Sequence, residues 1–447
     1  MDLPGLSRHL IAANTVSEHG TAAAVEILKP LYESAGLRVE IFADPNDPKQ
    51  QNILGTLSGV DPSGLLLVTH LDTVDPGPLE LWTETGGNPF ALTQKGDRLF
   101  GLGSADTKLD ALCKVFAARA YRGQKLRRTV QLLGTHQEEV GAVGAHQFVD
   151  GPAFQAKFVA CSEPSELEVI RAHKGYAVVE VAVELERTRP LSGPFEEVVF
   201  EGRGAHSSTP NLGINAIEKA FDSIRGAAFA SLEAGTVANK VPARCVVIRP
   251  TQRVGGKPLT LAEEPVDAAP TGAVAERLFE LWRNLACVQE PQVNAAFDPD
   301  RCVVNWGIAR IRGARAQLTF DCRLLPGHDP EKLTAAFEAS ASAMATEVGA
   351  AIRVKVSRSN PAMELNEPSE LLSKAMQACG DVGLRERPGV KPTNTEAGVF
   401  HRAGAEAIVF GPGRSTGNAH TANEHTSLAQ MEKAIEFYRA LIERLCR

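Results

Sequence analysis

Two adjacent glutamates, Glu138 and Glu139, are the residues around which chemistry can first be built. They follow an apolar run at residues 129–133 that predicts a buried strand, and a helical pattern begins near Ala142. Open α/β sheets bind ligands where a strand ends and leads into a helix. On extended chain neighbouring side chains point to opposite sides, so one glutamate can hold a metal ion while the other faces a water molecule beside it. A solvated acidic loop is the alternative for an isolated pair.

His70 and Asp72 form a second candidate pair. They follow residues 64–69, a continuous apolar run typical of a central strand covered on both faces. Residues two apart project to the same side of an extended chain. This spacing suits an imidazole that binds a metal ion and is oriented by a nearby carboxylate. The alternative is a histidine and an aspartate that meet by chance in a loop.

Three further side chains of this kind stand at the ends of predicted elements. Asp106 follows a glycine-rich segment and opens a helix predicted to reach about Tyr121, so it is either a helix cap or a metal ligand. Glu163 follows a strand predicted at residues 157–162. His420 follows a strand predicted at 407–410 and a glycine-rich segment, which lacks the Gly-Lys-Ser/Thr signature of a phosphate-binding loop.

His70, Asp106, Glu139, Glu163 and His420 together offer two imidazoles and three carboxylates. This is the ligand set of a two-zinc hydrolytic site, in which one shared carboxylate bridges the two ions. Cobalt or manganese would suit the same donors. A phosphoesterase with two metal ions is a rival interpretation, but no basic cluster for phosphate accompanies these residues.

Length and composition limit the number of domains and the class of protein that can position these residues. The chain of 447 residues is long enough for two domains, and 43% hydrophobic and 23% charged residues are typical of a soluble globular protein. The net charge of −7 indicates neither a nucleic acid nor an anionic membrane as a partner. No apolar stretch long enough for a membrane span and no signal peptide are visible, and the 8 cysteines form no CxxC pair. We therefore expect reduced, mostly buried thiols and a cytoplasmic location.

Five motifs, in order along nearly the whole chain, resemble those of M20-family metallopeptidases. This family includes glutamate carboxypeptidase, acetylornithine deacetylase, succinyl-diaminopimelate desuccinylase and aminoacyl-histidine dipeptidase. The motifs are HLDTV at 70–74, GLGSADTK at 101–108, EEVG at 138–141, EPS at 163–165 and AHTANE at 419–424. The resemblance implies an α/β fold with a mixed, mostly parallel sheet flanked by helices, as in di-zinc exopeptidases, and an inserted α+β lid or dimerisation domain.

The same resemblance implies a role for each predicted site residue. His70 and Glu163 would hold one zinc ion, Glu139 and His420 would hold the other, and Asp106 would bridge them. Glu138 would be the general base, and Asp72 would orient His70.

Residues 175–327 resemble the inserted lid domain, which leaves 1–174 and 328–447 for the catalytic domain. Residues 176–183 alternate like a half-exposed strand, and a helix over about 214–224 and a strand at 316–323 follow. In the family, the position of His206 reaches the partner subunit's active site and polarises the scissile carbonyl. We therefore expect a homodimer that forms through the lid. Two alternatives stay open: His206 packs near the following helix, or an insertion at about 250–300 keeps the chain a monomer.

Substrate contacts are predicted at Arg323, Asn239, Glu396 and Gly413. The resemblance places Arg323 near a substrate carboxylate, and an ion pair with Asp321 is an equal alternative. Asn239 begins an Asn-x-x-Pro motif that stands ahead of the insertion, whereas commoner family members place it directly before the Asp-x-Arg strand. Glu396 stands where many relatives have aspartate, and in having glutamate the chain is more similar to the aminoacyl-histidine dipeptidases.

These features predict a hydrolase with two Zn2+ ions per chain that cleaves the amide bond of a small N-acyl amino acid or short peptide. A dipeptidase of the aminoacyl-histidine type is an alternative. A metal-binding homologue that has lost catalysis is another, but the retained Glu138 argues against it. The sequence does not identify the acyl group or the side chain that is recognised.

Overall fold

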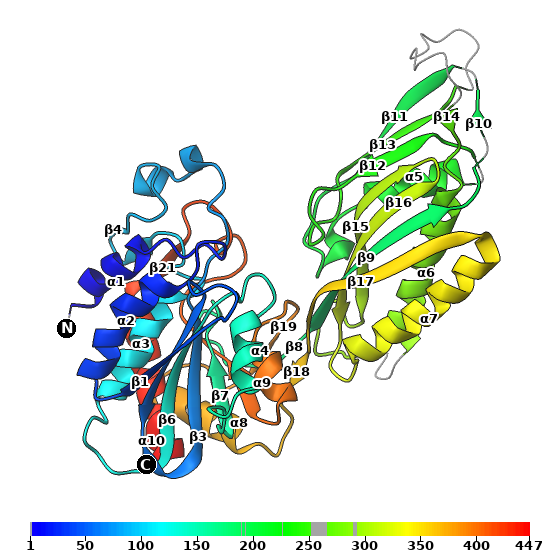
Figure 1. Ribbon diagram of the computed structural model, residues 1–447. Helices are drawn as coiled ribbons and strands as arrows, with labels where there is room; N and C mark the ends of the chain where they lie inside the picture. Colours follow the sequence, from blue (N-terminus) through cyan, green and yellow to red (C-terminus); the bar gives the residue numbers. More distant parts are fainter. Residues whose placement is uncertain (1, 189, 193, 226, 252–265, 289–292) are drawn as a thin grey trace. The chain divides into compact units, whose positions relative to one another are not determined.

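The computed structural model describes residues 2–188, 190–192, 194–225, 227–251, 266–288 and 293–447, which fall into two compact units (Figure 1). Unit 1 comprises residues up to 173 together with 363–391 and 395–447, and unit 2 comprises residues 174–362 and 392–394. The first boundary lies next to the one expected after residue 174. Residues 328–362, expected in the catalytic domain, belong instead to unit 2, because their strand pairs with the first long strand of that unit.

The strands of unit 1 lie in two sheets. They are β1 Arg38–Ala43, β2 Gln51–Leu57, β3 Gly59–His70, β4 Thr93–Lys95, β5 Arg98–Phe100, β6 Leu126–Thr135, β7 Phe158–Cys161, β8 Ile170–His173, β18 Met363–Glu364, β19 Gly389–Lys391, β20 Glu406–Val409 and β21 His425–Ser427. The larger sheet has the order β1-β2-β6-β3-β7-β20-β8-β18, with β19 paired to β8, and the smaller sheet has the order β21-β5-β4. Because β6, β3, β7 and β20 run parallel to one another, their carboxyl ends lie at one edge of the sheet.

Helices cover both faces of the larger sheet, as Figure 1 shows. They are α1 Leu3–Ala12, α2 Ala22–Ser34, α3 Lys108–Arg119, α4 Val143–Val149, α8 Glu370–Asp381, α9 Ala397–Arg402 and α10 Leu428–Cys446, with short 3-10 turns η1 Leu79–Leu81 and η2 Thr83–Thr85. The side chains of β3 pack alternately against the helices of the two faces. Leu65 and Leu67 pack with α2, α3 and α10, whereas Leu66 and Val68 pack with α4 and α9. Since successive side chains of a strand point to opposite faces, a continuous apolar run is what a doubly covered strand requires. The expected mixed sheet flanked by helices is confirmed.

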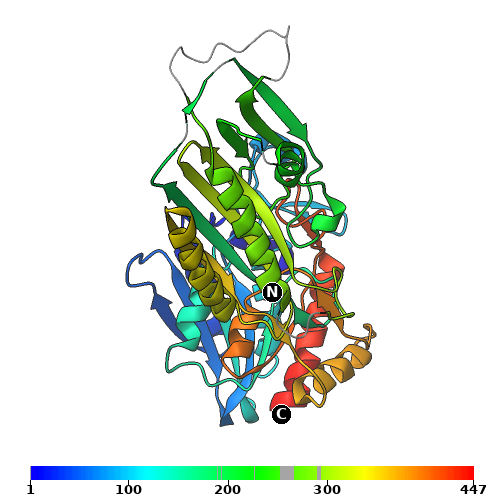
Figure 2. The same cartoon turned by 90° about the vertical axis from the view of Figure 1, so that its right-hand side faces the viewer.

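Unit 2 contains an antiparallel sheet with the order β11-β13-β12-β15-β16-β9-β17 and a separate pair, β10 and β14. Its strands are β9 Gly175–Leu185, β10 Pro190–Leu191, β11 Phe195–Glu201, β12 Ser231–Ala234, β13 Arg244–Pro250, β14 Val266–Asp267, β15 Val303–Arg312, β16 Arg315–Leu324 and β17 Ala350–Asn360. Its helices are α5 Ala216–Ile224, α6 Thr271–Val288 and α7 Pro330–Val348, with the 3-10 turn η3 Pro210–Leu212. Helices α6 and α7 lie side by side on one face of the sheet (Figure 2).

An aromatic cluster fixes the helices of unit 2 to that face. Phe221 of α5 stacks on Trp306 of β15 with ring centroids 5.0 Å apart, and Phe279 of α6 lies 5.2 Å from the same ring. Trp282 of α6 meets Phe337 of α7 edge to face at 5.0 Å. Large aromatic side chains contribute much of the apolar area that a small domain buries, so this cluster is the core of unit 2.

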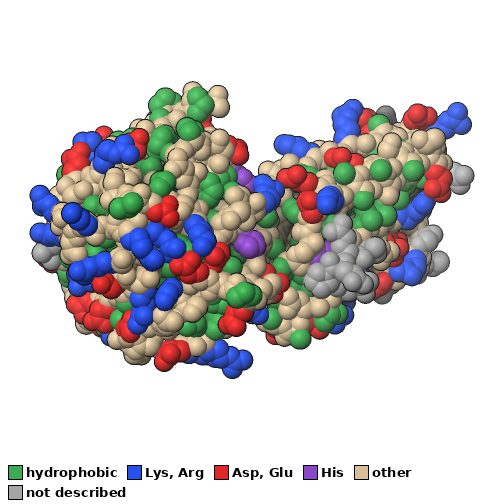
Figure 3. All heavy atoms as spheres, turned by 90° about the horizontal axis from the view of Figure 1, so that it is seen from below, with side chains coloured by type: hydrophobic (Ala, Val, Ile, Leu, Met, Phe, Trp, Pro, Cys, Tyr) green, Lys and Arg blue, Asp and Glu red, His purple; other side chains and the backbone are tan. Residues whose placement is uncertain are grey.

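The insertion expected at about 250–300 lies partly outside the described residues, at 252–265 and 289–292, and its described part includes β14 and α6. The seven cysteines whose side chains are described are all buried and free of disulfides, as expected. Among the described helices, none is long and apolar enough to cross a membrane. Figure 3 shows acidic and basic side chains interspersed over one face, without a large patch of a single sign.

Candidate metal centre and active site

The elements of unit 1 deliver five predicted ligands to one edge of the sheet. Strand β3 ends at His70, β7 ends two residues before Glu163, and β6 ends shortly before Glu139. Asp106 stands two residues before the start of α3, and His420 lies in the loop that follows β20. The parallel order of the strands therefore gathers residues that lie far apart in the sequence.

Asp106 lies between the two histidines. Its Oδ1 is 3.1 Å from Nε2 of His70, and its Oδ2 is 3.1 Å from Nε2 of His420. Nε2 of His420 is also 3.0 Å from Oε1 of Glu139. One carboxylate that faces an imidazole with each oxygen has the arrangement that a bridging metal ligand needs.

Within the described part of the chain, three groups of side chains offer donor atoms that all lie within 4.8 Å of one another, close enough to share an ion. One group is His70, Asp106 and Glu163, and another is Asp106, Glu139 and His420. These two groups share Asp106 and coincide with the two ligand sets that the resemblance implies. The third group, His70, Glu138 and Glu139, places the predicted base beside both sets. Nitrogen and carboxylate oxygen donors of this kind fit a pair of zinc ions.

Protonation equilibria in this cluster also fit a cation. Burial raises the pKa of Glu138 well above the usual range of a carboxylic acid, although His70 acts in the opposite direction. The negative charges of Glu139 and Asp106 raise the pKa of His420 to about 12. Without a metal ion, the imidazole of His420 therefore carries a proton at neutral pH. A divalent cation would replace such protons, because metal ligands bind in their deprotonated forms.

The backbone around the two glutamates differs from the expected extended chain. Glu138 and Glu139 lie in a turn between β6 and α4, flanked by Gln137 and Ala142, which both have a φ of 54°. This left-handed region is uncommon for residues other than glycine. The two glutamates therefore do not alternate along an extended chain, contrary to the expectation, whereas the helix does begin at Val143 as expected.

Asp72 holds that turn. Its carboxylate accepts hydrogen bonds from the backbone N–H of Glu138 at 2.9 Å and of Glu139 at 3.2 Å, and from the hydroxyl of Ser17 at 2.7 Å. The carboxylate is 3.7 Å from Nδ1 of His70, whereas the Asp72 carbonyl oxygen is only 3.1 Å from the same nitrogen. Asp72 thus contacts His70 through its backbone and positions the two glutamates through its side chain.

Sequence reasoning missed three residues around the ligands. Lys391 of β19 forms a buried ion pair with Oε2 of Glu163. Glu424 accepts hydrogen bonds from the backbone N–H of Ala105 at 2.9 Å and of Asp106 at 3.0 Å, and burial raises its pKa to about 8. The third residue is Ser17. Only Glu424 carried a signal, because it stands in the motif that contains His420.

Glu396 and Gly413 also belong to unit 1. Glu396 is buried, accepts a hydrogen bond from the hydroxyl of Thr135 at 2.9 Å, and has a pKa that burial raises to about 7. Gly413 has a φ of +85°, and a Cβ added there would lie 2.9 Å from the Cβ of Ala105. The glycine-rich segment therefore packs directly against the segment that carries Asp106.

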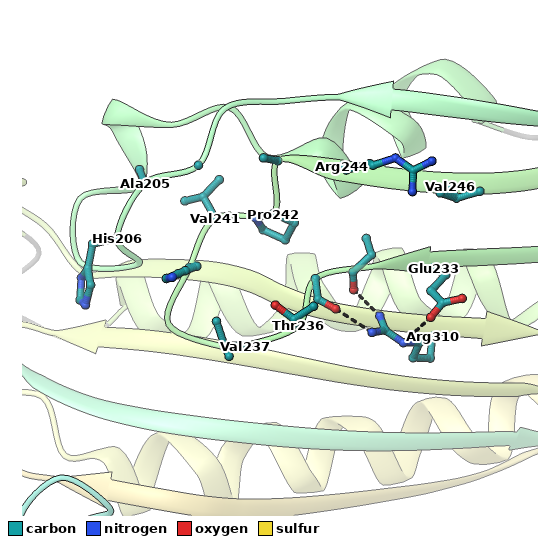
Figure 4. Close-up of a pocket in the computed structure, with 15 residues that line it drawn as sticks. Ala205, His206, Glu233, Thr236, Val237, Val241, Pro242, Arg244, Val246 and Arg310 are labelled. Carbon is teal, nitrogen blue, oxygen red and sulfur yellow. Dashed lines mark hydrogen bonds and ion pairs between the residues drawn. The ribbon is translucent and has the colours of Figure 1, made fainter. Parts of the chain in front are cut away.

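The remaining predicted residues lie in unit 2. His206 is exposed at the edge of a cavity of about 890 Å3, which Figure 4 shows together with Val241 and Arg310. The ring of His206 lies 2.8 Å from the hydroxyl of Ser208 through Nδ1. Asn239 is exposed, and its backbone carbonyl oxygen accepts a hydrogen bond from the backbone N–H of Ser207 at 3.0 Å. Both residues therefore belong to one pair of adjoining loops.

Arg323 forms the ion pair with Asp321 that was the alternative to a substrate contact. Its Nε and Nη2 lie 2.7 and 3.1 Å from the two carboxylate oxygens of Asp321, and Nη2 also donates to the hydroxyl of Ser207 at 3.3 Å. The guanidinium is buried and lies 5.2 Å from the ring of Tyr176. A substrate carboxylate at Arg323 would have to compete with Asp321.

Residues 66–444 match the model of the family described as Peptidase family M20/M25/M40. Acetylornithine deacetylase of Proteus mirabilis (strain HI4320) is 33% identical over 225 residues, which cover 49% of this chain and 52% of that protein. The corresponding enzyme of Photorhabdus laumondii is 33% identical over 225 residues, which cover 49% and 53%. The chain thus spans about half the length of the curated relatives it matches.

Solved structures resemble the chain over nearly its whole length. Aminoacylhistidine dipeptidase from Vibrio alginolyticus has a TM-score of 0.69 at 14% identity and covers 99% of this chain and 96% of its own. An M20 family metallo-carboxypeptidase from Sulfolobus solfataricus has a TM-score of 0.63 at 17% identity and covers 99% of both chains. At these identities the likeness concerns the fold, and it confirms the expected fold class.

Proposed function

Because the chain belongs to Peptidase family M20/M25/M40, we propose that it is a metal-dependent hydrolase that cleaves the amide bond of a small N-acyl amino acid or short peptide. The position of Asp106 carries this proposal, since each of its carboxylate oxygens lies 3.1 Å from a different imidazole. Such a residue can serve two ions at once, and two-metal sites are used for hydrolysis.

In this proposal each ion has its own ligands and shares one. His70 and Glu163 hold the first zinc ion, Glu139 and His420 hold the second, and Asp106 bridges them. The two groups of donor atoms within 4.8 Å support this division. Cobalt or manganese would occupy the same donors, because neither nitrogen nor carboxylate ligands select strictly for zinc.

The residues around the ions then divide the chemistry. The zinc ions would supply Lewis acidity, which acidifies the attacking water and polarises the amide carbonyl. Glu138 takes the proton from the water and returns it to the leaving amine. Burial raises the pKa of Glu138, which favours the return of the proton to the leaving amine. Asp72 positions this base together with the ligand Glu139, because it binds the backbone N–H groups of both.

The substrate is proposed to be a small acylated amino acid. The deacetylase relatives support a deacylase, although they match over about half of their length. We propose that Glu396 and Gly413 of unit 1 and Asn239 and Arg323 of unit 2 contact the substrate. For Arg323 this requires that the substrate carboxylate replaces or joins Asp321 at the guanidinium.

We further propose that the chain is a homodimer in which His206 of each subunit donates a hydrogen bond to the oxyanion in the site of the other. The exposure of His206 supports this, and so do the exposed apolar side chains of Leu212 (62%), Ile214 (49%) and Val237 (42%) in the adjoining loops. Apolar side chains that remain exposed together often mark an interface. The seven buried, free cysteines support a cytoplasmic location, where thiols stay reduced.

Hydrolysis of a panel of N-acetyl amino acids, N-succinyl amino acids and dipeptides by zinc-loaded protein tests the proposed function. We expect turnover of at least one class, loss of that turnover on chelation, and recovery on addition of zinc. Glu138→Gln protein loaded in the same way serves as the control for contaminating enzymes. Protein that binds two metal ions yet hydrolyses none of these amides would instead support a homologue without catalytic activity.

A further inference from the structure

Beneath the candidate metal centre lies a buried ion pair that none of the steps above uses. Lys114 and Asp110, one turn apart on α3, are 1% and 2% exposed, and Nζ of Lys114 is 3.3 Å from Oδ2 of Asp110. Charged side chains are almost never fully buried unless they are paired and hydrogen-bonded. A pair of this kind inside the core therefore calls for an explanation.

The partners of Lys114 are the residues that directly precede two predicted ligands. Its ammonium donates to the carbonyl oxygen of Val68, to the hydroxyl of Thr69 at 2.8 Å, and to the hydroxyl of Ser162. Thr69 precedes His70 at the end of β3, and Ser162 precedes Glu163 just after β7. The hydroxyls of Thr69 and Ser162 are 3.0 Å apart, and the Ser162 N–H donates to the Val68 carbonyl at 2.8 Å. One ammonium group thus joins the two strand ends that carry His70 and Glu163.

Asp110 extends the same connection to two further elements. Its Oδ2 accepts hydrogen bonds from the hydroxyl of Ser162 at 2.5 Å and from the hydroxyl of Tyr438 at 2.6 Å. Tyr438 lies on α10, and its hydroxyl is also 3.1 Å from the carbonyl oxygen of Phe410, directly after β20. Asp110 itself stands four residues after Asp106, in the first turn of α3. The pair is therefore tied to the segments of His70 and Glu163, which belong to one ion alone, and of Asp106, which both ions share.

We propose that the Lys114–Asp110 ion pair is a positioning device for the ion held by His70, Asp106 and Glu163, an inference that rests on the proposed two-metal site. The pair holds the ends of β3 and β7 at a fixed distance from each other and from the start of α3. Residues that orient metal ligands change metal affinity without contacting the ion. Because the partners of the pair adjoin His70 and Glu163, and neither Glu139 nor His420, the effect is specific to one of the two ions.

The test is a two-step zinc titration in competition with a chelator, together with the visible spectrum of the cobalt-loaded protein. Glu163→Gln and His420→Ala mark which step belongs to which ion. The main variants are Thr69→Val, which keeps the volume and removes one acceptor of Lys114, and Lys114→Met with Asp110→Asn, which removes both charges together. Changing both avoids a single unpaired buried charge, which is strongly destabilising.

We expect both variants to lower the zinc affinity of the step that Glu163→Gln identifies by about tenfold or more. The cobalt spectrum should change as well. The zinc affinity of the step that His420→Ala identifies should stay within about twofold of the wild-type value. Glu370→Gln is the matched control, because it disrupts the Arg128–Glu370 ion pair of the same unit, whose Arg128 lies near the amino end of β6. This control should lower the melting temperature without changing either step.

Two results would overturn the inference. One is an unchanged zinc affinity at both steps in folded Thr69→Val protein and in the double variant. The other is a change in zinc affinity that is confined to the step identified by His420→Ala. Failure of the proposed function looks different, because the wild-type protein would then either take up no metal or show both zinc steps and hydrolyse none of the amides.

Discussion

The carboxylates Asp72, Asp106 and Glu163 of unit 1 and the His206 loop of unit 2 differ in how completely the chain surrounds them. In unit 1, Asp106, Asp72 and Glu163 are buried and each is engaged by side chains or backbone of the same unit. In unit 2, His206 is exposed and is accompanied by exposed apolar residues such as Leu212. The candidate metal ligands are thus held within one unit, whereas the loop presents His206 outwards.

This difference fits the tasks proposed for the two regions. Buried carboxylates cost free energy unless cations, hydrogen bonds or metal ions compensate them, so their surroundings must be complete. An oxyanion donor must instead approach the substrate after it has bound, which favours an exposed group on a separate unit. The predictions below test whether unit 1 carries the chemistry and unit 2 only assists it.

The largest effect is expected for Glu138→Gln. Removal of the general base should lower kcat by about 10²–10⁴-fold, because proton transfer is lost while the fold and ligands remain. Steady-state kinetics and metal analysis of the same preparation measure the two consequences separately. Turnover equal to that of the wild type would show that another group is the base.

His206→Ala should have the next largest effect, a loss of about 10²–10³-fold in kcat, as for removal of one oxyanion donor. Metal content should not change, because His206 belongs to a different unit from the ligands. A loss of bound metal in this variant would contradict the division of tasks between the units.

Mixing His206→Ala with Glu138→Gln protein, under conditions in which subunits exchange, shows which subunit supplies His206. If the site is shared between subunits, mixed dimers contain one intact site, and about a quarter of wild-type activity should return for random pairing. If each chain builds its own site, the mixture stays inactive. Sedimentation that reports a single chain would also refute the shared site.

Zinc affinity should fall as the pH is lowered. In the metal-free protein His420 has a pKa of about 12, so it is protonated at neutral pH and must lose its proton to bind. Each displaced proton changes the apparent affinity by about tenfold per pH unit, and the affinity therefore rises with pH. Titration calorimetry in buffers of different ionisation enthalpy counts the released protons, and no proton release would contradict this assignment.

Ser17→Ala should have the smallest effect, a decrease of about tenfold in kcat/KM. Ser17 donates to the carboxylate of Asp72, which in turn holds Glu138 and Glu139. The matched control is Ser63→Ala, which removes a hydroxyl that donates to Asp61 near the amino end of β3. Equal kinetics for the two variants would show that the bond from Ser17 has no part in positioning the turn.

The sequence predicts the strand ends of unit 1 well, because each apolar run is local and its length and period are visible. It does not predict the turn at Glu138, since the left-handed residues Gln137 and Ala142 are not glycines and leave no signal. Lys391 and Ser17 are equally hidden, because their roles arise from contacts with residues distant in the sequence.

The assignment of residues 328–362 to unit 2 is a second feature that the sequence did not predict. These residues form α7 and β17, and the partner of β17 in the sheet is β9, which is far away along the chain. Pairing over such a distance depends on which edge of the sheet remains free. For Arg323 the two alternatives had equal support in the sequence, and the ion pair with Asp321 is present in the folded chain.

The number of metal ions bound per chain tests the central claim most directly. Elemental analysis of protein purified without chelator, followed by titration with zinc, should give about two ions per chain, as two ligand sets that share Asp106 require. His420→Ala protein should retain about one ion, because the set of His70, Asp106 and Glu163 stays complete. Wild-type protein that contains no divalent metal and takes up none on titration would contradict the account.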